Sequence, residues 1–404
     1  MKVSLLSKFA VLLCIAAFGL TGCWNAKDVD NLDYVNAVGI DYAKESKEYT
    51  VYLQLLSFQR VAKTEGGGID TKPIPVWMAI GHGQTYAEAI GKITVEAEKR
   101  LFWGHVTSLI LGEGLLEKGE ITDVLQSMFR FYELRYTMWV FGTKEPIDKL
   151  FEASPNFERS RLNMIIHAPL DNYLQRSYIK PLRLHDFIAD YYETAKTLVL
   201  PSIAISGKVW RINEKPIHSL RYNGIYVFWD KKNTGFLPLE KVYGLRWMEK
   251  GARRAPVLIE DDKLLANLRM EHPKHAIYMR TINDKPVFDV HVVVKGIISE
   301  LNENVPVGTL IQQVETKIEK EIRDTYAAGL KQKADLLGLC DHLYLRGAKG
   351  YSKYAGDRTF LLHPDSLGKV TVDAQITTAG KYTYKLYKDV TDESVTQPEG
   401  HRLP

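Results

Sequence analysis

The stretch 85–114, TYAEAIGKITVEAEKRLFWGHVTSLILGEG, decides the fold class. Thr85 followed by Glu88 matches the capping box that opens a helix. Apolar residues then recur at every fourth position, at Ala89, Ile93 and Ala97. This spacing is typical of one face of an amphipathic helix. From His105 the sequence becomes a short apolar run that ends in glycine, as strands do. A helix that leads directly into a strand predicts a sheet with helices packed on it.

The segments on either side continue this alternation. Strands are expected at 34–43, 49–58, 75–83 and 136–143, and helices at 121–135, 145–154, 156–166 and 184–196. Strands and helices that alternate at short intervals favour a sheet covered by helices. The fold class is therefore predicted as α+β, a mixed α/β arrangement.

The second half of the chain begins with strands. Residues 200–237 predict several strands joined by turns at NEKP and KKNTG, and a short helix is expected at 238–249. Two further strands, 275–283 and 286–301, flank Asp-Lys and predict a long hairpin. Residues 368–386 alternate as closing strands.

The longest helical pattern runs from about Gly308 to Leu337. Its apolar or small residues recur every fourth position, at Leu310, Val314, Ile318, Ile322, Tyr326, Leu330 and Ala334. A run of this length fits a coiled-coil partner helix or one long helix packed on a sheet. We predict the second arrangement.

The N-terminus has the pattern of an export signal. Lys2 and Lys8 are followed by an apolar run at 9–20, which is shorter than the about 20 residues that a spanning helix needs. An ordinary cleaved leader or a buried core helix would not explain why Leu-Thr-Gly directly precedes Cys23. That tetrapeptide resembles the lipobox of bacterial lipoproteins. The resemblance implies that residues 1–22 are removed and that Cys23 carries S-diacylglycerol and an N-acyl chain, enough for stable membrane attachment.

The chain has three cysteines, Cys14, Cys23 and Cys340. Because the first lies in the leader and the second would carry lipid, no intramolecular disulfide is expected after processing. Cys340 is predicted to be a buried small apolar residue, with a catalytic nucleophile as the alternative.

Composition and motifs argue against several function classes. With 53 basic and 49 acidic residues the chain is close to neutral, which argues against a nucleic-acid binder that works by counterion release. The sequence has no G-x-S-x-G elbow, no Walker A loop and no G-x-G-x-x-G after a strand. His272 and His275 form a His-x-x-His pair without a nearby third ligand. We predict a protein that is not an enzyme and that has no cofactor and no metal.

The chain has seven tryptophans, all of them between residues 24 and 247. Five of them could line a ligand pocket, namely Trp103, Trp139, Trp210, Trp229 and Trp247. Aromatic residues in strands are more often core residues. We expect these side chains in the core.

Several motifs, in order along nearly the whole chain, resemble the GerAC-like (Ger(x)C) spore germination lipoproteins. The matching segments are GCWNAKDVDNLDYVNAVGID, GQTYAEAIGKITVEAEKRLFWGHVTSLILGEGLLEKG, FRFYELR, YNGIYVFWDKKNTGFLPLEKVYGLRWMEKG and KADLLGL. One departure is Leu337, where the family pattern has Phe before the glycine. Within the second segment, Arg100 and His105 flank an apolar turn. We expect a structural role for both, with Arg100 bonding carbonyls at the helix end.

The resemblance implies three α/β domains, each built on a mixed sheet. Boundaries are expected at 24–205, 206–300 with mostly strands, and 301–404 with the long helix. It also implies the C subunit of a nutrient germinant receptor, which acts with two integral-membrane subunits (A- and B-type). The subunit would lie on the outer face of the cell membrane or inner spore membrane, held by Cys23. Whether it touches the germinant stays open. A solute-binding lipoprotein of a transporter is the alternative.

Overall fold

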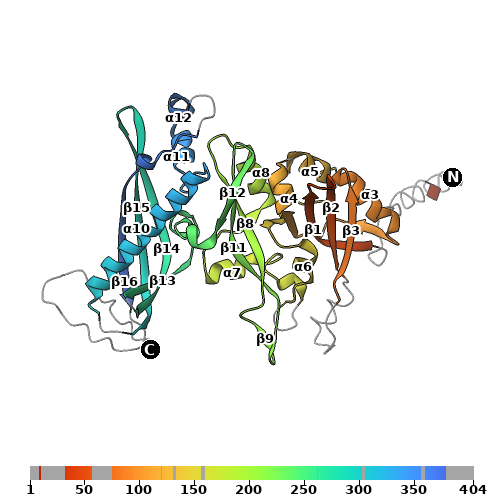
Figure 1. The fold of residues 1–404 in the computed structure, drawn as a ribbon, viewed down its shortest axis with the longest axis horizontal. Helices are drawn as coiled ribbons and strands as arrows, with labels where there is room; N and C mark the ends of the chain where they lie inside the picture. The colour runs from red at the N-terminus through yellow and green to blue at the C-terminus, as the bar shows by residue number, and fades with distance from the viewer. Residues whose placement is uncertain are drawn as a thin grey trace.

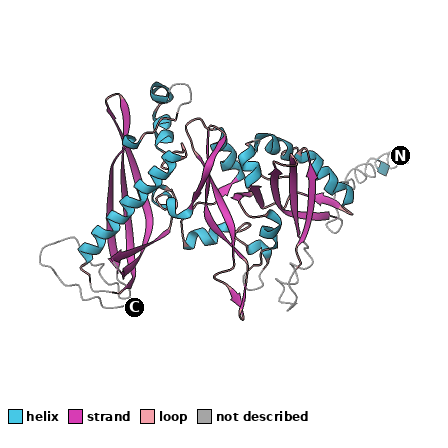
Figure 2. Cartoon of the chain, in the orientation of Figure 1, coloured by secondary structure: helices cyan, strands magenta, loops and turns pink. Residues whose placement is uncertain are grey.

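Figure 1 shows the computed structural model of the chain. The structure describes residues 9–10, 32–56, 75–119, 121–130, 133–155, 160–261, 263–302, 305–355 and 360–378. The described part contains two large β-sheets, each with helices packed on it, which lie side by side along the long axis (Figures 1 and 2). The predicted mixed α/β class is confirmed.

The first sheet contains the strands of the N-terminal half. These are β1 (Leu32–Ala43), β2 (Glu48–Leu56), β3 (Trp77–Gly83), β4 (Arg100–Phe102), β5 (Ser108–Gly112), β6 (Trp139–Thr143), β7 (Leu182–Arg183), β8 (Leu198–Ser206), β11 (Ser219–Trp229) and β12 (Lys232–Pro238). Their order is β12-β11-β8-β6-β5-β1-β2-β3, with β4 beside β1 and β7 beside β6. Strands β1, β5, β6 and β8 pair in parallel, and the strands at both edges pair antiparallel.

Helices cover both faces of this sheet (Figure 1). They are α3 (Tyr86–Glu96), α4 (Glu113–Lys118), α5 (Ile121–Met128), α6 (Ile147–Glu152), η3 (Arg161–Asn163), α7 (Pro169–Gln175) and α8 (Leu184–Tyr192). On β5, Leu109 and Leu111 face the core shared with α3, α4, α5 and α8, whereas Ile110 faces the core shared with α6. The alternation of side chains along a strand produces these two cores.

Helix α3 starts as predicted but is shorter. The Thr85 hydroxyl accepts a hydrogen bond from the Glu88 amide at 3.1 Å, and the Glu88 carboxylate accepts from the Gln84 amide. The helix ends at Glu96, and residues 100–102 pair with β1 as β4. Strand pairing therefore overrides the helical pattern at this end. Helix α5 likewise ends at Met128, and the described part of 156–166 has only the short η3.

The second sheet is built from the C-terminal half. Its strands are β13 (Arg254–Asp261), β14 (Lys263–Ile282), β15 (Lys285–Leu301) and β16 (Leu367–Thr378), in that order. Strands β13 to β15 are antiparallel neighbours, and β16 is parallel to β15. The predicted hairpin is confirmed, but its turn is Asn283-Asp284, both with positive φ, rather than Asp-Lys. Positive φ at both central residues matches a type I′ turn.

One long helix packs on the second sheet. Helix α10 (Val307–Lys331) lies across β13 to β16 in Figure 1, with Leu310, Val314, Ile318 and Ile322 fully buried. The helix-on-sheet prediction is confirmed. The helix ends before Ala334 because the chain turns at Lys333, which has a positive φ of 50°. Two short helices, α11 (Leu339–Arg346) and α12 (Ala348–Ala355), and the turn η5 (Pro364–Ser366) lead to β16.

A separate small core joins the two sheets. Buried residues of β11 and β12 contact the end of α10 and the segment after it, through Val227, Leu237, Ala328, Ala334 and Leu336. The chain crosses here through η4 (Leu239–Lys241) and α9 (Leu245–Met248), where one short helix was predicted. The division at 24–205, 206–300 and 301–404 stays a prediction. Strands β11 and β12 belong to the same hydrogen-bonded sheet as β8, and strands β13 to β15 belong to the same sheet as β16.

A small hairpin extends from the first sheet between β8 and β11. Strands β9 (Arg211–Ile212) and β10 (Lys215–Pro216) pair antiparallel, and the hairpin projects from the body in Figure 1. Of the five tryptophans expected in the core, four are buried, namely Trp103, Trp139, Trp229 and Trp247. The expectation is wrong for Trp210, which precedes β9 and exposes 39% of its surface.

Candidate functional site

The described residues contain no group of three His, Cys, Asp or Glu side chains that could hold a metal ion. His272 lies at an irregularity of β14 with a positive φ, and its amide donates to the Arg253 carbonyl. His275 pairs with Val292 in the sheet. Cys340 is fully buried, as predicted, and burial together with Asp335 raises the pKa of its thiol. A thiol with a raised pKa is a poor nucleophile.

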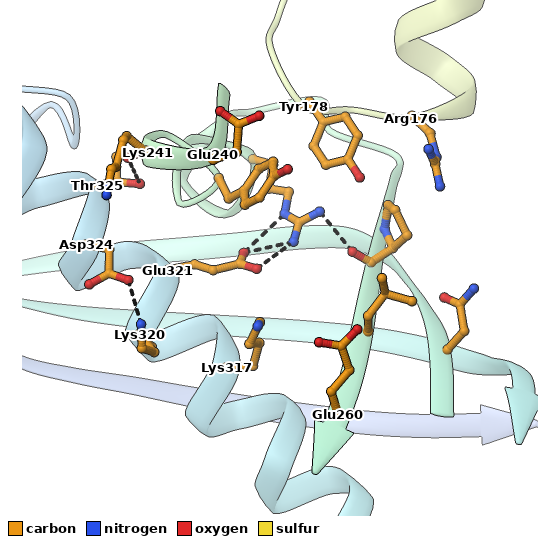
Figure 3. A pocket seen from close by; sticks show the side chains of 15 residues that line it. Arg176, Tyr178, Glu240, Lys241, Glu260, Lys317, Lys320, Glu321, Asp324 and Thr325 are labelled. Atoms are coloured by element: carbon orange, nitrogen blue, oxygen red, sulfur yellow. Dashed lines mark hydrogen bonds and ion pairs between the residues drawn. The ribbon is translucent and has the colours of Figure 1, made fainter. Parts of the chain in front are cut away.

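The main candidate site is a cleft where the two sheets meet (Figure 3). Its volume is about 350 Å³, and it is walled by α10, by β13 and β14, by η4 and α9, and by the segment after α7. Charged and aromatic side chains dominate the wall. They include Arg176, Tyr178, Glu240, Lys241, Tyr243, Arg246, Glu260, Lys317 and Glu321.

A buried ion pair forms the floor of this cleft. Arg246 on α9 donates from Nη2 to both carboxylate oxygens of Glu321 on α10, at 2.9 and 2.8 Å, and from Nε at 3.3 Å. Trp247 Nε1 donates to the same carboxylate at 2.7 Å. The third guanidinium nitrogen donates to the Pro256 carbonyl of β13 at 2.9 Å. Arg246 therefore ties α9, α10 and β13 together.

Two tyrosines cover the guanidinium. The rings of Tyr178 and Tyr243 lie 5.4 Å apart, and the Arg246 guanidinium carbon lies 5.2 and 5.3 Å from their centroids. Arginine is favoured in this position because its flat group stacks on aromatic faces. Burial raises the pKa of Tyr243, so its hydroxyl stays a neutral hydrogen-bonding group.

The approach of α9 to α10 depends on Gly244. Its amide donates to Thr325 Oγ1 at 2.9 Å. A Cβ at this position would lie 2.5 Å from the Glu321 carbonyl oxygen, so any other residue would push α10 away. The segment Gly244–Trp247 is thus shaped to place its arginine on α10.

The rim of the cleft carries charges of both signs. Arg176, Lys241 and Lys317 supply cations, and Glu240 and Glu260 supply carboxylates. In Figure 3 these side chains surround the cleft from different elements. The arrangement offers hydrogen bonds and charge to a small polar ligand or a charged peptide.

A second set of contacts joins β1 to α4. The Asp41 carboxylate accepts hydrogen bonds from its neighbour Tyr42 at 2.8 Å and from the Leu115 amide in the first turn of α4 at 3.1 Å. Burial raises the pKa of Asp41 in spite of these bonds. A Cβ on Gly112 would lie 2.2 Å from the Asp41 carboxylate, and one on Gly114 would lie 2.0 Å from the Tyr42 carbonyl. Both glycines are required by this close approach.

A third contact involves Arg100. The sequence suggested helix-end carbonyls as its partners; the structure gives it Glu133, 33 residues further along the chain, with Arg100 Nη2 to Glu133 Oε1 at 2.8 Å. The other Glu133 oxygen accepts from the Trp103 amide at 3.2 Å. His105 packs against the rings of Tyr34 and Phe102, and burial and the Arg135 charge lower its pKa.

The sequence did not predict a buried polar network around His167. Its Nδ1 lies 2.7 Å from Thr107 Oγ1, and its Nε2 lies 3.2 Å from both the Gln54 Oε1 and the Asn36 Nδ2. Burial, and then the Arg161 charge, lower the pKa of His167 to about 3. The ring is therefore neutral and acts as a fixed hydrogen-bonding group. The four side chains come from positions far apart in sequence, so no local motif signals them.

Asp335 lies in the segment between the end of α10 and the start of α11. Its carboxylate accepts from the Cys340 amide at 2.6 Å, and its own amide donates to Thr197 Oγ1 at 2.8 Å. Burial raises the pKa of Asp335 to about 6. This residue links the second sheet's helices to the chain that enters β8.

Cys23, the residue predicted to carry the lipid, lies outside the described residues. In the part of the chain that the structure does describe, no helix combines the length and the apolar character needed to cross a membrane.

Two domain families match the chain. The family described as "Spore germination protein N-terminal domain" matches residues 25–205, and the one described as "Spore germination B3/ GerAC like, C-terminal" matches residues 223–380. Together they cover most of the 404 residues. The chain belongs to the GerAC-like spore germination family. The resemblance found in its motifs is confirmed.

Among curated relatives, Spore germination protein KC of Bacillus subtilis (strain 168) is 23% identical over 85% of this chain and 88% of its own length. Spore germination protein B3 of the same organism is 25% identical over 90% of this chain and 91% of its own length. The crystal structure of the GerBC protein matches with a TM-score of 0.51 at 17% identity, over 84% of this chain and 96% of that one. This last likeness shows the fold.

In this GerAC-like chain the motifs found in the sequence meet in space. The Gly-Ile-Asp of β1 meets the Gly-Glu-Gly that opens α4 through Asp41. The arginine of the motif after α3 meets Glu133 of FRFYELR. The Gly-Leu-Arg-Trp segment meets α10 through Glu321. These motifs are thus explained by packing between elements.

Proposed function

We propose that this GerAC-like chain is the lipid-anchored C subunit of a nutrient germinant receptor of spores. It acts with two integral-membrane subunits, of A and B type, in nutrient-triggered germination. The observation that carries the proposal is the family match over both halves of the chain, residues 25–205 and 223–380. We also propose that it is not an enzyme; the family match and the buried Cys340 support this.

The proposed anchor is Cys23, preceded by Leu-Thr-Gly. Two acyl chains on one cysteine are enough for stable attachment to a bilayer. Attachment would hold the two sheets at the outer face of the membrane, where a tethered chain has a high effective concentration near its partners. Mass spectrometry of the protein from cells should give an N-terminal peptide that starts at Cys23 and is heavier by a diacylglyceryl group. A mature N-terminus elsewhere, or one without lipid, would overturn the anchor.

The partnership is tested by co-purification in detergent from spores with a tagged chain. Two integral-membrane proteins should be recovered with the tagged wild type, and less of both with Cys23→Ala. Recovery of soluble proteins alone would contradict a receptor subunit even if the lipid is found. The two parts of the proposal can therefore fail separately.

A solute-binding lipoprotein is the second candidate, and the cleft between the two sheets is the observation that favours it. Such a protein binds its solute tightly by itself. Calorimetry with the purified chain and a panel of amino acids, sugars and nucleosides separates the two functions. Tight binding by the isolated chain would favour the solute-binding role.

A further inference from the structure

The β9–β10 hairpin forms a two-stranded sheet of its own, separate from the two large sheets. It extends past the ends of β8 and β11, and it projects from the body in Figure 1. Its two strands have only two residue pairs, Ile212 with Lys215 and Arg211 with Pro216. A two-stranded hairpin of this size is marginally stable by itself.

The hairpin exposes large apolar side chains. Every residue from 208 to 216 is exposed to solvent. Val209 exposes 75% of its surface, Trp210 39% and Ile212 52%. Three large apolar residues within four positions on a projecting tip are an unusual surface for a soluble protein.

Basic residues alternate with these apolar ones. Lys208, Arg211 and Lys215 are positive and Glu214 alone is negative, so the tip has a formal charge of +2. Residues opposite each other in a ladder share a face, which puts Lys215 beside Ile212, with Trp210 two positions earlier on the same side. An indole, an aliphatic side chain and a lysine therefore point the same way.

We propose that this hairpin dips into the interface of an anionic lipid bilayer. Tryptophan is favoured at the level of the headgroups, where its ring is half apolar and half polar. Lysine and arginine extend their stems along the apolar layer and place their charges among anionic phosphates. The cores of protein interfaces instead are depleted of lysine, which this tip carries at positions 208 and 215.

The contact would orient the molecule, since a chain anchored at one point gains a second attachment. It does not depend on the lipid at Cys23, because it concerns contact by residues 208–216 alone. Basic side chains near a surface strengthen binding only where the lipid is anionic, so the contact is expected to weaken with salt.

The test uses the purified full chain mixed with vesicles of phosphatidylcholine, with or without phosphatidylglycerol, whose acyl chains carry bromine as a quencher of tryptophan emission. In anionic vesicles, part of the tryptophan emission should be quenched by the brominated lipid. Trp210→Phe should reduce this quenched part by the contribution of one tryptophan. Trp77→Phe is the matched control, because Trp77 exposes 64% of its surface on β3 but lies away from the hairpin. Its loss should leave the quenching unchanged.

A second set of variants tests the role of the basic side chains. Arg211→Glu with Lys215→Glu should remove the Trp210 contribution, and Lys285→Glu, at the exposed first residue of β15, should not. Quenching that is the same with Trp210→Phe as with the wild type would overturn the proposal. Trp210 quenching of equal size in purely neutral vesicles would overturn the role of charge. Cross-linking of position 212 to an integral-membrane protein in spore membranes, without quenching by lipid, would assign the hairpin to a protein partner instead.

Discussion

Glu321 on α10 holds the guanidinium of Arg246 on α9 by two nitrogens, Nη2 at 2.8 Å and Nε at 3.3 Å. Arg246 is 3% exposed and Glu321 is 9% exposed, so both charges are removed from water. The pair lies where the two sheets meet, at the floor of the cleft. If one side chain of the pair is removed, the charge of the other stays buried without a counter-charge.

Glu321→Gln should therefore destabilise the fold strongly. It keeps the shape of the side chain but leaves the Arg246 charge buried without a counter-charge. Breaking one partner of a buried pair costs about 3–5 kcal/mol of unfolding free energy. Urea unfolding followed by circular dichroism measures the loss.

The matched control lies on the same helix. Glu319 binds Arg323 at 2.8 Å, but its side chain is 41% exposed. Glu319→Gln should change the unfolding free energy by less than about 0.5 kcal/mol. Equal losses for the two variants would show that the Arg246 pair does not depend on burial.

Two buried groups should give opposite dependences of stability on pH. His167 has a pKa of about 3 in the fold, against about 6.5 when unfolded. Between these values the unfolded chain binds the proton, so stability falls as the pH falls. Asp335 has a pKa of about 6 in the fold, against about 3.9 when unfolded. In that range the folded chain binds the proton, so stability rises as the pH falls.

The two effects should nearly cancel in the wild type between about pH 4 and about pH 6. Relative to the wild type, Asp335→Asn should lose stability on acidification, by up to about 1.4 kcal/mol for each pH unit. His167→Gln should gain it over the same range. Unfolding midpoints in urea across this range measure both slopes. Variants that parallel the wild-type curve would show that neither group titrates with these values.

Gly114→Ala should disturb the junction of β1 and α4. The new Cβ would lie 2.0 Å from the Tyr42 carbonyl oxygen, and neither backbone can move without breaking the Asp41 contact with Leu115. Overpacking of this kind costs about 1–3 kcal/mol. Gly91→Ala is the control: it lies inside α3 with nothing within 4 Å of the new Cβ. It should instead stabilise the protein by about 0.5–1 kcal/mol. Thermal unfolding of the two variants should shift in opposite directions.

Local sequence patterns predicted the elements but not their partners. The capping residue Thr85 and the spacing of Leu310, Val314 and Ile318 correctly predicted where two helices lie. Both patterns depend on neighbours within a few residues. The predicted end of α3 is wrong because pairing of residues 100–102 with the distant β1 fixes it. The predicted end of α10 is wrong because the chain turns at Lys333, which the apolar spacing does not signal.

In the candidate site, too, the sequence indicates local segments but not the distant residues that they contact. The segment Gly244–Trp247 is part of a family motif, but nothing in it indicates that its partner is Glu321, 74 residues after Trp247. The network of His167 is less visible still, since its contacts span up to 131 residues. Trp210 was misassigned because an exposed and a buried tryptophan in a strand-rich segment have the same sequence signal.

Glu133 joins two segments of the chain, and its substitutions should separate its two roles. One oxygen accepts from Arg100 and the other from the Trp103 amide, and the side chain is only 7% exposed. Glu133→Gln keeps an acceptor for the amide but removes the charge, whereas Glu133→Ala removes both. Because a lost acceptor for a buried donor costs about 1–3 kcal/mol, the Ala variant should be less stable than the Gln variant by that amount.

Arg100→Ala should cost less than about 1 kcal/mol, because the Arg100 side chain is 52% exposed and its pair is screened by water. Melting temperatures of the purified chains measure the order, which is wild type, Arg100→Ala, Glu133→Gln and Glu133→Ala from most to least stable. If Arg100→Ala proved as damaging as Glu133→Ala, the ion pair rather than the Trp103 hydrogen bond would hold β4 to the segment after α5.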